Sequence, residues 1–75
     1  MQRFEYHGFW FWILPEFESP EERIARGDWQ SRLLGYRLNI RYRGRLLGDE
    51  RTGFSTIEEA RTWGENEVDA MLDSL

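Results

Sequence analysis

Residues 36–45 read Tyr-Arg-Leu-Asn-Ile-Arg-Tyr-Arg-Gly-Arg, and the first eight alternate between apolar or aromatic side chains and polar ones. Successive side chains of a strand point to opposite faces, so this period of two predicts a strand with one buried face. Glycine adopts the positive φ that tight hairpins need, so Arg43-Gly44 predicts a two-residue turn and a return strand from Arg45. The polar face then presents a row of arginines with one asparagine: Arg37, Asn39, Arg41, Arg43 and Arg45.

An aromatic stretch from Phe4 to Leu14 predicts another strand, which Pro15 is expected to end. Its two faces are both apolar: His7, Phe9, Phe11 and Ile13 on one, and Tyr6, Gly8, Trp10, Trp12 and Leu14 on the other. Such a strand is expected to be central, or to have its outer face covered by a partner. Trp10 and Trp12 are therefore candidate aromatic anchors of an interface.

Two helices are predicted from their start signals. Ser19 followed by Pro20 and two glutamates predicts a short helix that ends at Gly27. Ser55-Thr56-Ile57-Glu58 reads as a capping box that opens a long helix to about Ser74. An apolar stripe at helical spacing would face the sheet: Ile57, Ala60, Gly64, Val68, Met71 and Leu75.

Gly64 stands in the middle of that stripe, where a glycine costs about 1 kcal/mol relative to alanine. We expect it at a point where helix and sheet approach closely. Residues 28–34 are compatible with an extension of the short helix or with the lead into the middle strand.

The predicted fold is α+β, with residues 1–75 as one domain. Three or four antiparallel strands form a sheet, the long C-terminal helix packs on one face, and a short helix lies in the first connection. A chain of 75 residues without cysteine depends on a small core, supplied here by five Phe, four Trp and three Tyr. A partner or a second copy of the chain would add buried surface.

Charge is unevenly distributed along the chain, whose net charge is −4. Residues 23–51 carry eight arginines against three acids, whereas residues 1–22 and 52–75 are both acidic. All ten basic residues are arginine; this fits a GC-rich genome as well as selection for bidentate, stackable cations. No apolar run approaches the ~20 residues of a membrane span, and no signal peptide is recognisable. We expect no membrane association and a cytoplasmic location in a bacterial host.

The sequence carries no catalytic signature. His7 is the only histidine, and together with Glu5 it offers two of the ligands that a metal site needs. Glu16 and Glu18 lack a visible His, Cys or Lys partner for acid–base chemistry. The glycines are spaced as turn residues rather than as a phosphate-binding loop. We therefore expect a protein that is not an enzyme and that uses neither metal nor cofactor.

Residues 35–72 resemble the N-terminal arm-binding domains of tyrosine integrases. The matching features are the strand 36–43, Gly44, the return strand 45–47, and then Phe54, Thr56, Glu59, Ala60 and Trp63 at the helix opening. In that family the polar face of the sheet enters the DNA major groove. The resemblance implies DNA contacts by Arg37, Arg41, Arg43 and Arg45. The acidic ends of this chain depart from that pattern.

The chain also resembles, in type, the small cysteine-free inhibitors of phages and mobile elements, among them anti-CRISPR proteins. Ser55, Thr56, Glu58, Glu59 and Trp63 form an ending similar to that of at least one of these proteins. This resemblance implies docking on a host complex that handles nucleic acid.

Three interpretations of the arginine face stay open: pairing with the chain's own acids, docking on such a complex, or direct binding of DNA or RNA. The outer face of the long helix is either a solvated surface or a phosphate mimic made by Glu58, Glu59, Glu65, Asp69 and Asp73. Our leading expectation is an inhibitor of the anti-CRISPR type, and the alternative is a small DNA-binding regulator.

Overall fold

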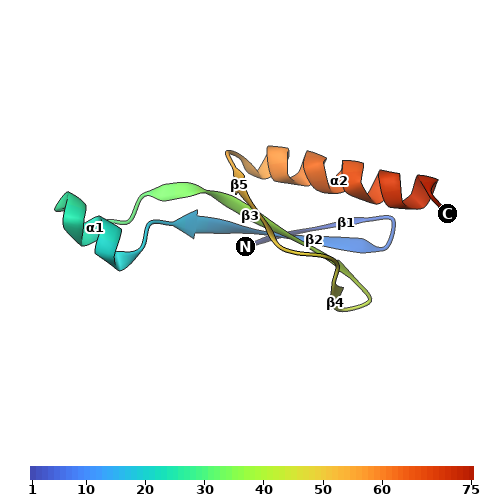
Figure 1. Cartoon of the computed structure of the whole chain (residues 1–75), viewed down its shortest axis with the longest axis horizontal. Helices are drawn as coiled ribbons and strands as arrows, with labels where there is room; N and C mark the ends of the chain where they lie inside the picture. The colour runs from blue at the N-terminus through green and yellow to red at the C-terminus, as the bar shows by residue number, and fades with distance from the viewer.

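The computed structural model describes all residues 1–75 and contains one antiparallel sheet and two helices. Its strands are β1 (Gln2–Tyr6), β2 (Phe9–Phe17), β3 (Leu33–Tyr42), β4 (Arg45–Leu46) and β5 (Arg51–Phe54); its helices are α1 (Pro20–Arg26) and α2 (Ile57–Asp73). The sheet order is β1-β2-β3-β4, and β5 also pairs with β3. In Figure 1, α2 runs along the sheet, whereas α1 lies at the far end of the β2–β3 ribbon. The predicted α+β class is confirmed.

The aromatic N-terminal stretch forms a hairpin, so the prediction of a single strand from Phe4 to Leu14 was wrong. His7 and Gly8 have φ values of 52° and 84°, and Tyr6 pairs with Phe9 across the turn. Two consecutive positive φ angles match the right-handed twist of a two-residue hairpin. The turn moves Tyr6 to the side of the sheet that faces α2, away from Trp10.

Pro15 does not end β2, which continues to Phe17 and places Pro15 opposite Tyr36. The reason lies in the neighbouring strand, because β1 reaches only as far as Ile13. Beyond Ile13 β2 has a neighbour on one side only. An edge tolerates proline because the missing N–H can face away from the ladder.

The middle hairpin forms as predicted. Arg43 and Gly44 make its turn with φ values of 52° and 79°, and Tyr42 pairs with Arg45. The return strand breaks at Gly48 into β4 and β5, and β5 pairs with β3 around Leu38. The structure also resolves the ambiguous segment 28–34: Leu33 and Leu34 belong to β3, whereas residues 28–32 lie in neither helix nor strand.

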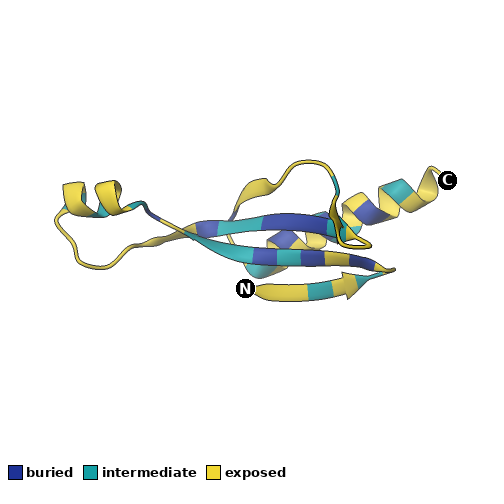
Figure 2. Ribbon diagram, turned by 90° about the horizontal axis from the view of Figure 1, so that it is seen from below, coloured by how far each residue is buried: buried dark blue, intermediate teal, exposed yellow.

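The core lies between the sheet and α2. Its buried apolar residues are Phe9, Phe11, Ile13, Leu38, Ile40, Phe54, Ala60 and Val68. Figure 2 shows buried residues along the central strands and on α2, while α1 and the outer strands are largely exposed. The close approach expected at Gly64 is confirmed, because a Cβ there would stand 3.2 Å from ring atoms of Phe11.

Both helix starts are capped by side chains. Ser19 Oγ accepts a hydrogen bond from Glu22 N, and Gly27 ends α1 in the left-handed conformation, as predicted. In α2 the cap is Thr56 rather than Ser55, since Thr56 Oγ1 accepts from Glu59 N at 3.1 Å. Glu59 in turn accepts a hydrogen bond from Ser55 N. The predicted capping box is therefore shifted by one residue.

The apolar stripe of α2 is shorter than predicted. Met71 still packs against the core, whereas Leu75 is 99% exposed and lies beyond the helix.

The molecule is elongated, with extents of 52 × 21 × 17 Å. One end of the long axis is formed by residues 14–34, which we call the arm: the end of β2, α1 and the start of β3. α1 packs against no other helix or strand, and none of its residues is buried. The sheet and α2 form the body of the molecule (Figure 1).

Candidate binding surface on the open sheet face

The sheet has one face that α2 does not cover, which we call the open face. It is built by the residues that alternate with the buried ones, because successive strand side chains point to opposite sides. Cross-strand pairing aligns them in rows: Arg3 pairs with Trp12 and Trp12 with Asn39, while Trp10 pairs with Arg41. The open face therefore combines these side chains from three strands: Arg3, Glu5, Trp10, Trp12, Leu14, Arg37, Asn39 and Arg41.

Trp12 is the centre of this face. The guanidinium carbon of Arg41 lies 4.0 Å from the centroid of the Trp12 ring, and that of Arg3 lies 4.8 Å from it. The two arginines come from the strands on either side of β2. A cation over an indole ring is attracted by the ring quadrupole, so Trp12 orders both guanidinium groups.

Arg3 was not among the residues singled out from the sequence. Its place beside Trp12 depends on the turn at His7-Gly8, which brings β1 back along β2. The signal was present in the glycine at position 8, but a histidine in the first turn position is far from the usual Asn-Gly pattern.

A shallow depression of about 230 Å³ opens beside this cluster. It is lined by Arg3, Trp10, Trp12, Arg41 and Gly44. Trp10 is 46% exposed. The depression thus offers a flat aromatic surface bordered by two guanidinium groups.

Arg37 and Asn39 are less available than predicted. Arg37 Nε lies 3.7 Å from Glu50 Oε2, so this arginine pairs with one of the chain's own acids. Asn39 is buried. The Nε atoms of Arg37 and Arg41 are enclosed without any hydrogen-bond partner.

The predicted row of arginines does not continue beyond Arg41. Arg43 lies in the turn, with its guanidinium carbon 5.4 Å from the centroid of the Tyr42 ring. Arg45 pairs with Tyr42, which places it on the side of the sheet that faces α2. Of the five predicted residues only Arg37, Asn39 and Arg41 share the open face.

The acids of α2 are partly engaged within the chain. Glu59 accepts a hydrogen bond at the helix start, and Glu65 forms an ion pair with Arg61 at 3.4 Å. Asp69 accepts a hydrogen bond of 2.8 Å from the Tyr6 hydroxyl, and this bond raises the pKa of Tyr6. Glu58 and Asp73 make no ion pair, so they are the freer members of the predicted set.

The remaining predicted acid, base and metal-ligand candidates, His7 and Glu18, lie in different parts of the molecule. His7 lies in a turn, edge-on to the Tyr6 ring at 4.5 Å, and no three His, Asp or Glu side chains gather as a metal site. Glu18 belongs to the arm, where hydrogen bonds from Arg26 hold the pKa of its carboxyl below the usual range.

Neither helix has the length and apolar character required to cross a membrane. Searches of protein families, curated proteins and solved structures find no significant match to this chain. The chemistry of the open face therefore has to be argued from its own residues.

Proposed function

We propose that this chain is a non-enzymatic binding protein that docks through its open face on a complex that handles nucleic acid and inhibits it, as anti-CRISPR proteins do. The observation that carries the proposal is Trp12, flanked by Arg3 and Arg41 on a sheet face that no element of the chain covers.

Tryptophan and arginine are the side chains most often responsible for binding energy at protein interfaces. The cation–π contacts hold the two arginines in place before binding, which lowers the entropy that association would cost. Trp10 adds exposed aromatic surface next to them.

The charges favour a partner with both anionic and basic regions. Guanidinium groups recognise phosphate and carboxylate in a bidentate way. The net charge of −4 and the acids of α2, among them Glu58 and Asp73, oppose binding to nucleic acid alone. A protein complex that holds nucleic acid presents acidic and phosphate groups to the open face and basic grooves to α2.

Retention on the immobilised chain tests the proposal. A lysate of CRISPR-bearing bacteria and purified guide-loaded effector complexes are passed over it, and target cleavage is assayed with and without the chain. We expect an effector complex to be retained and its cleavage to be inhibited. Trp12→Ala and Arg41→Ala should each weaken retention by roughly tenfold or more, as for interface hot spots.

Arg51→Ala is the matched control. Arg51 stacks over Trp63 at 4.8 Å on the opposite side of the sheet, so this variant loses a similar cation–π pair away from the open face. It should be retained like the unchanged chain. Recovery of no nucleic-acid machinery at all would contradict the proposed function.

The alternative is a small DNA-binding regulator. It is favoured by the arginines that β1 and β3 place on either side of Trp12, since strands can enter a DNA groove. A gel shift separates the two functions. Duplex binding that falls steeply with salt and is lost in Arg3→Ala and Arg41→Ala would favour the regulator. If the chain does not shift duplex DNA even at low salt, the DNA-binding function is excluded.

A further inference from the structure

The arm exposes large apolar side chains that the core does not use. The exposed fraction is 92% for Trp29, 70% for Ile24 and 57% for Phe17, and Leu33 and Leu34 are exposed as well. These five residues lie within one end of an elongated molecule. Phe17 pairs with Leu33 across the two strands, and Ile24 and Trp29 line one depression. Exposed apolar surface of this kind marks an interaction site more often than chance exposure does.

The arm is ordered by polar contacts rather than by apolar packing. Arg26 donates hydrogen bonds to both oxygens of the Glu18 carboxylate, to Asp28 Oδ2 at 2.7 Å and to the Gln30 carbonyl at 3.0 Å. Glu18 N donates to the Arg32 carbonyl at 2.9 Å, and Arg32 N donates to Glu18 Oε1 at 3.0 Å. The apolar side chains are thus held on a formed scaffold, which lowers the entropy cost of covering them.

The total surface indicates how much is left uncovered. A compact monomer of 9.1 kDa is expected to expose about 4,900 Å², whereas this chain exposes 5614 Å². The excess of about 700 Å² is close to the roughly 800 Å² that each partner contributes to a standard interface. The radius of gyration, 14.8 Å, likewise exceeds the roughly 11 Å of a compact chain of this length.

We propose that the arm is a dimerisation surface, on which the arm of a second copy of this chain packs about a twofold axis. In such an isologous contact the same patch meets itself, so its charges must complement one another. Outside the Arg26 cluster the arm carries Glu16, Glu21 and Glu22 against Arg23 and Arg32, which is close to balance. Over residues 14–34 as a whole, five acids face three arginines, an excess too small to attract a strongly charged partner.

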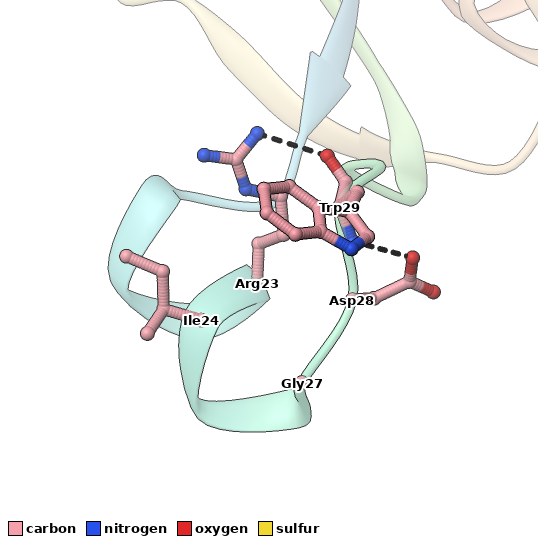
Figure 3. Close-up of a pocket in the computed structure, with 5 residues that line it drawn as sticks. All are labelled: Arg23, Ile24, Gly27, Asp28 and Trp29. Atoms are coloured by element: carbon pink, nitrogen blue, oxygen red, sulfur yellow. Dashed lines mark hydrogen bonds between the residues drawn. The ribbon is translucent and has the colours of Figure 1, made fainter.

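Figure 3 shows where apolar contact would centre. Ile24, Gly27 and Trp29 line a shallow depression of about 400 Å³ together with Arg23 and Asp28. Arg23 Nη1 donates to the Trp29 carbonyl at 3.1 Å, and Trp29 N donates to Asp28 Oδ1 at 2.7 Å. These bonds fix the backbone that carries the indole. Apolar side chains from the second copy would enter the depression and cover both Ile24 and Trp29.

Sedimentation equilibrium over a concentration series tests the proposal. The unchanged chain should show the mass of two copies at high concentration and dissociate on dilution. Trp29→Ser should raise the dimer dissociation constant by roughly tenfold or more. Leu75→Ser is the matched control, because Leu75 is equally exposed but lies outside the arm, and it should leave the constant unchanged. Circular dichroism verifies that both variants stay folded.

Distance measurement tests the arrangement itself. The chain has no cysteine, so Gln30→Cys and Ser74→Cys each provide a single site for a spin label, one in the arm and one near the C-terminus. Arm-to-arm packing predicts a shorter label-to-label distance for Gln30→Cys than for Ser74→Cys.

A monomer mass for the unchanged chain up to about 1 mM, where even weak interfaces form, would overturn the proposal. A shorter distance between the Ser74→Cys labels would overturn it too. Arg41→Ala should dimerise normally, so the outcome is independent of whether the open face binds an effector complex.

Discussion

At Gly64, the addition of a single Cβ atom would disturb the packing of α2 on the sheet. A Cβ at this position would stand 3.2 Å from three ring atoms of Phe11, and Phe11 is fully buried. The ring would have to shift by a few tenths of an ångström inside the core to make room. The cost of a glycine in the middle of α2 is therefore tolerated, because a residue without a side chain lets the helix approach the sheet.

Gly64→Ala is expected to lower the free energy of unfolding by about 1 kcal/mol, because overpacking costs about 1–3 kcal/mol and the gain in helix propensity returns only about 1 kcal/mol. Urea denaturation measures the change. Asn66→Ala, at an exposed position of the same helix, should instead stabilise the protein slightly. Equal stabilisation by both substitutions would contradict the close approach.

At the scale of single elements, the hairpin of β1 and β2 depends on its two-residue turn. Gly8→Ala should lower the free energy of unfolding by about 1–2 kcal/mol, because an L-residue is strained at a φ of 84°. The nearest atom to an added Cβ is 3.8 Å away, so the cost is one of backbone conformation rather than of space. His7→Asn should be neutral or stabilising, since asparagine suits the first position of this turn. Thermal unfolding of the two variants compares them directly.

The arm should lose its order in acid. Hydrogen bonds from Arg26 lower the pKa of Glu18, and backbone hydrogen bonds at Gln30, with Arg26, lower the pKa of Asp28. At a pH above the ordinary pKa values of these groups, 4.5 for Glu18 and 3.8 for Asp28, both carboxylates are ionised and stabilise the arm. This contribution is lost as the pH falls through the lowered pKa values of the folded protein. The amide signals of Gln30 and Arg32 in NMR spectra should shift in that range.

Amide signals of the body, such as that of Leu38, provide the reference in this titration. Arg26→Ala should reproduce the acid effect on the arm at neutral pH. An arm that keeps its amide shifts in the variant would show that the Glu18–Arg26 contact is not what orders it.

The middle hairpin and both helices were predictable, because alternation, Arg43-Gly44 and the capping residues each act locally. The first hairpin was not predictable, because aromatic residues stand on both sides of His7-Gly8. The sequence therefore resembles one uninterrupted strand across the turn. Pro15 was misjudged because the tolerance of β2 for proline depends on where β1 stops, which is a tertiary property.

The open face was predictable only in part for the same reason. Alternation correctly assigned Arg37, Asn39 and Arg41 to the face opposite the core. It could not place Arg45, whose side depends on the register across the turn. It also could not find Arg3, whose contact with Trp12 exists only because β1 folds back.

At the scale of the whole molecule, body and arm should differ in stability. The arm contains no apolar core residue, whereas the ladder from Phe9 to Ile13 lies over α2. Native-state hydrogen exchange should therefore show that amides of residues 14–34 exchange through local opening, and that amides of Phe11 and Ile40 exchange only through global unfolding. Equal protection in both regions at low concentration would contradict this division.

The two layers of the body also differ in sign, with arginines on the open face and acids along α2. Separated charge gives a molecule a dipole, and a dipole experiences a torque in an external field before any contact is made. Near an anionic surface this chain would be turned so that Trp12 leads and α2 trails. A protein with the same net charge of −4 spread evenly would only be repelled, so the layered arrangement itself selects the orientation of approach.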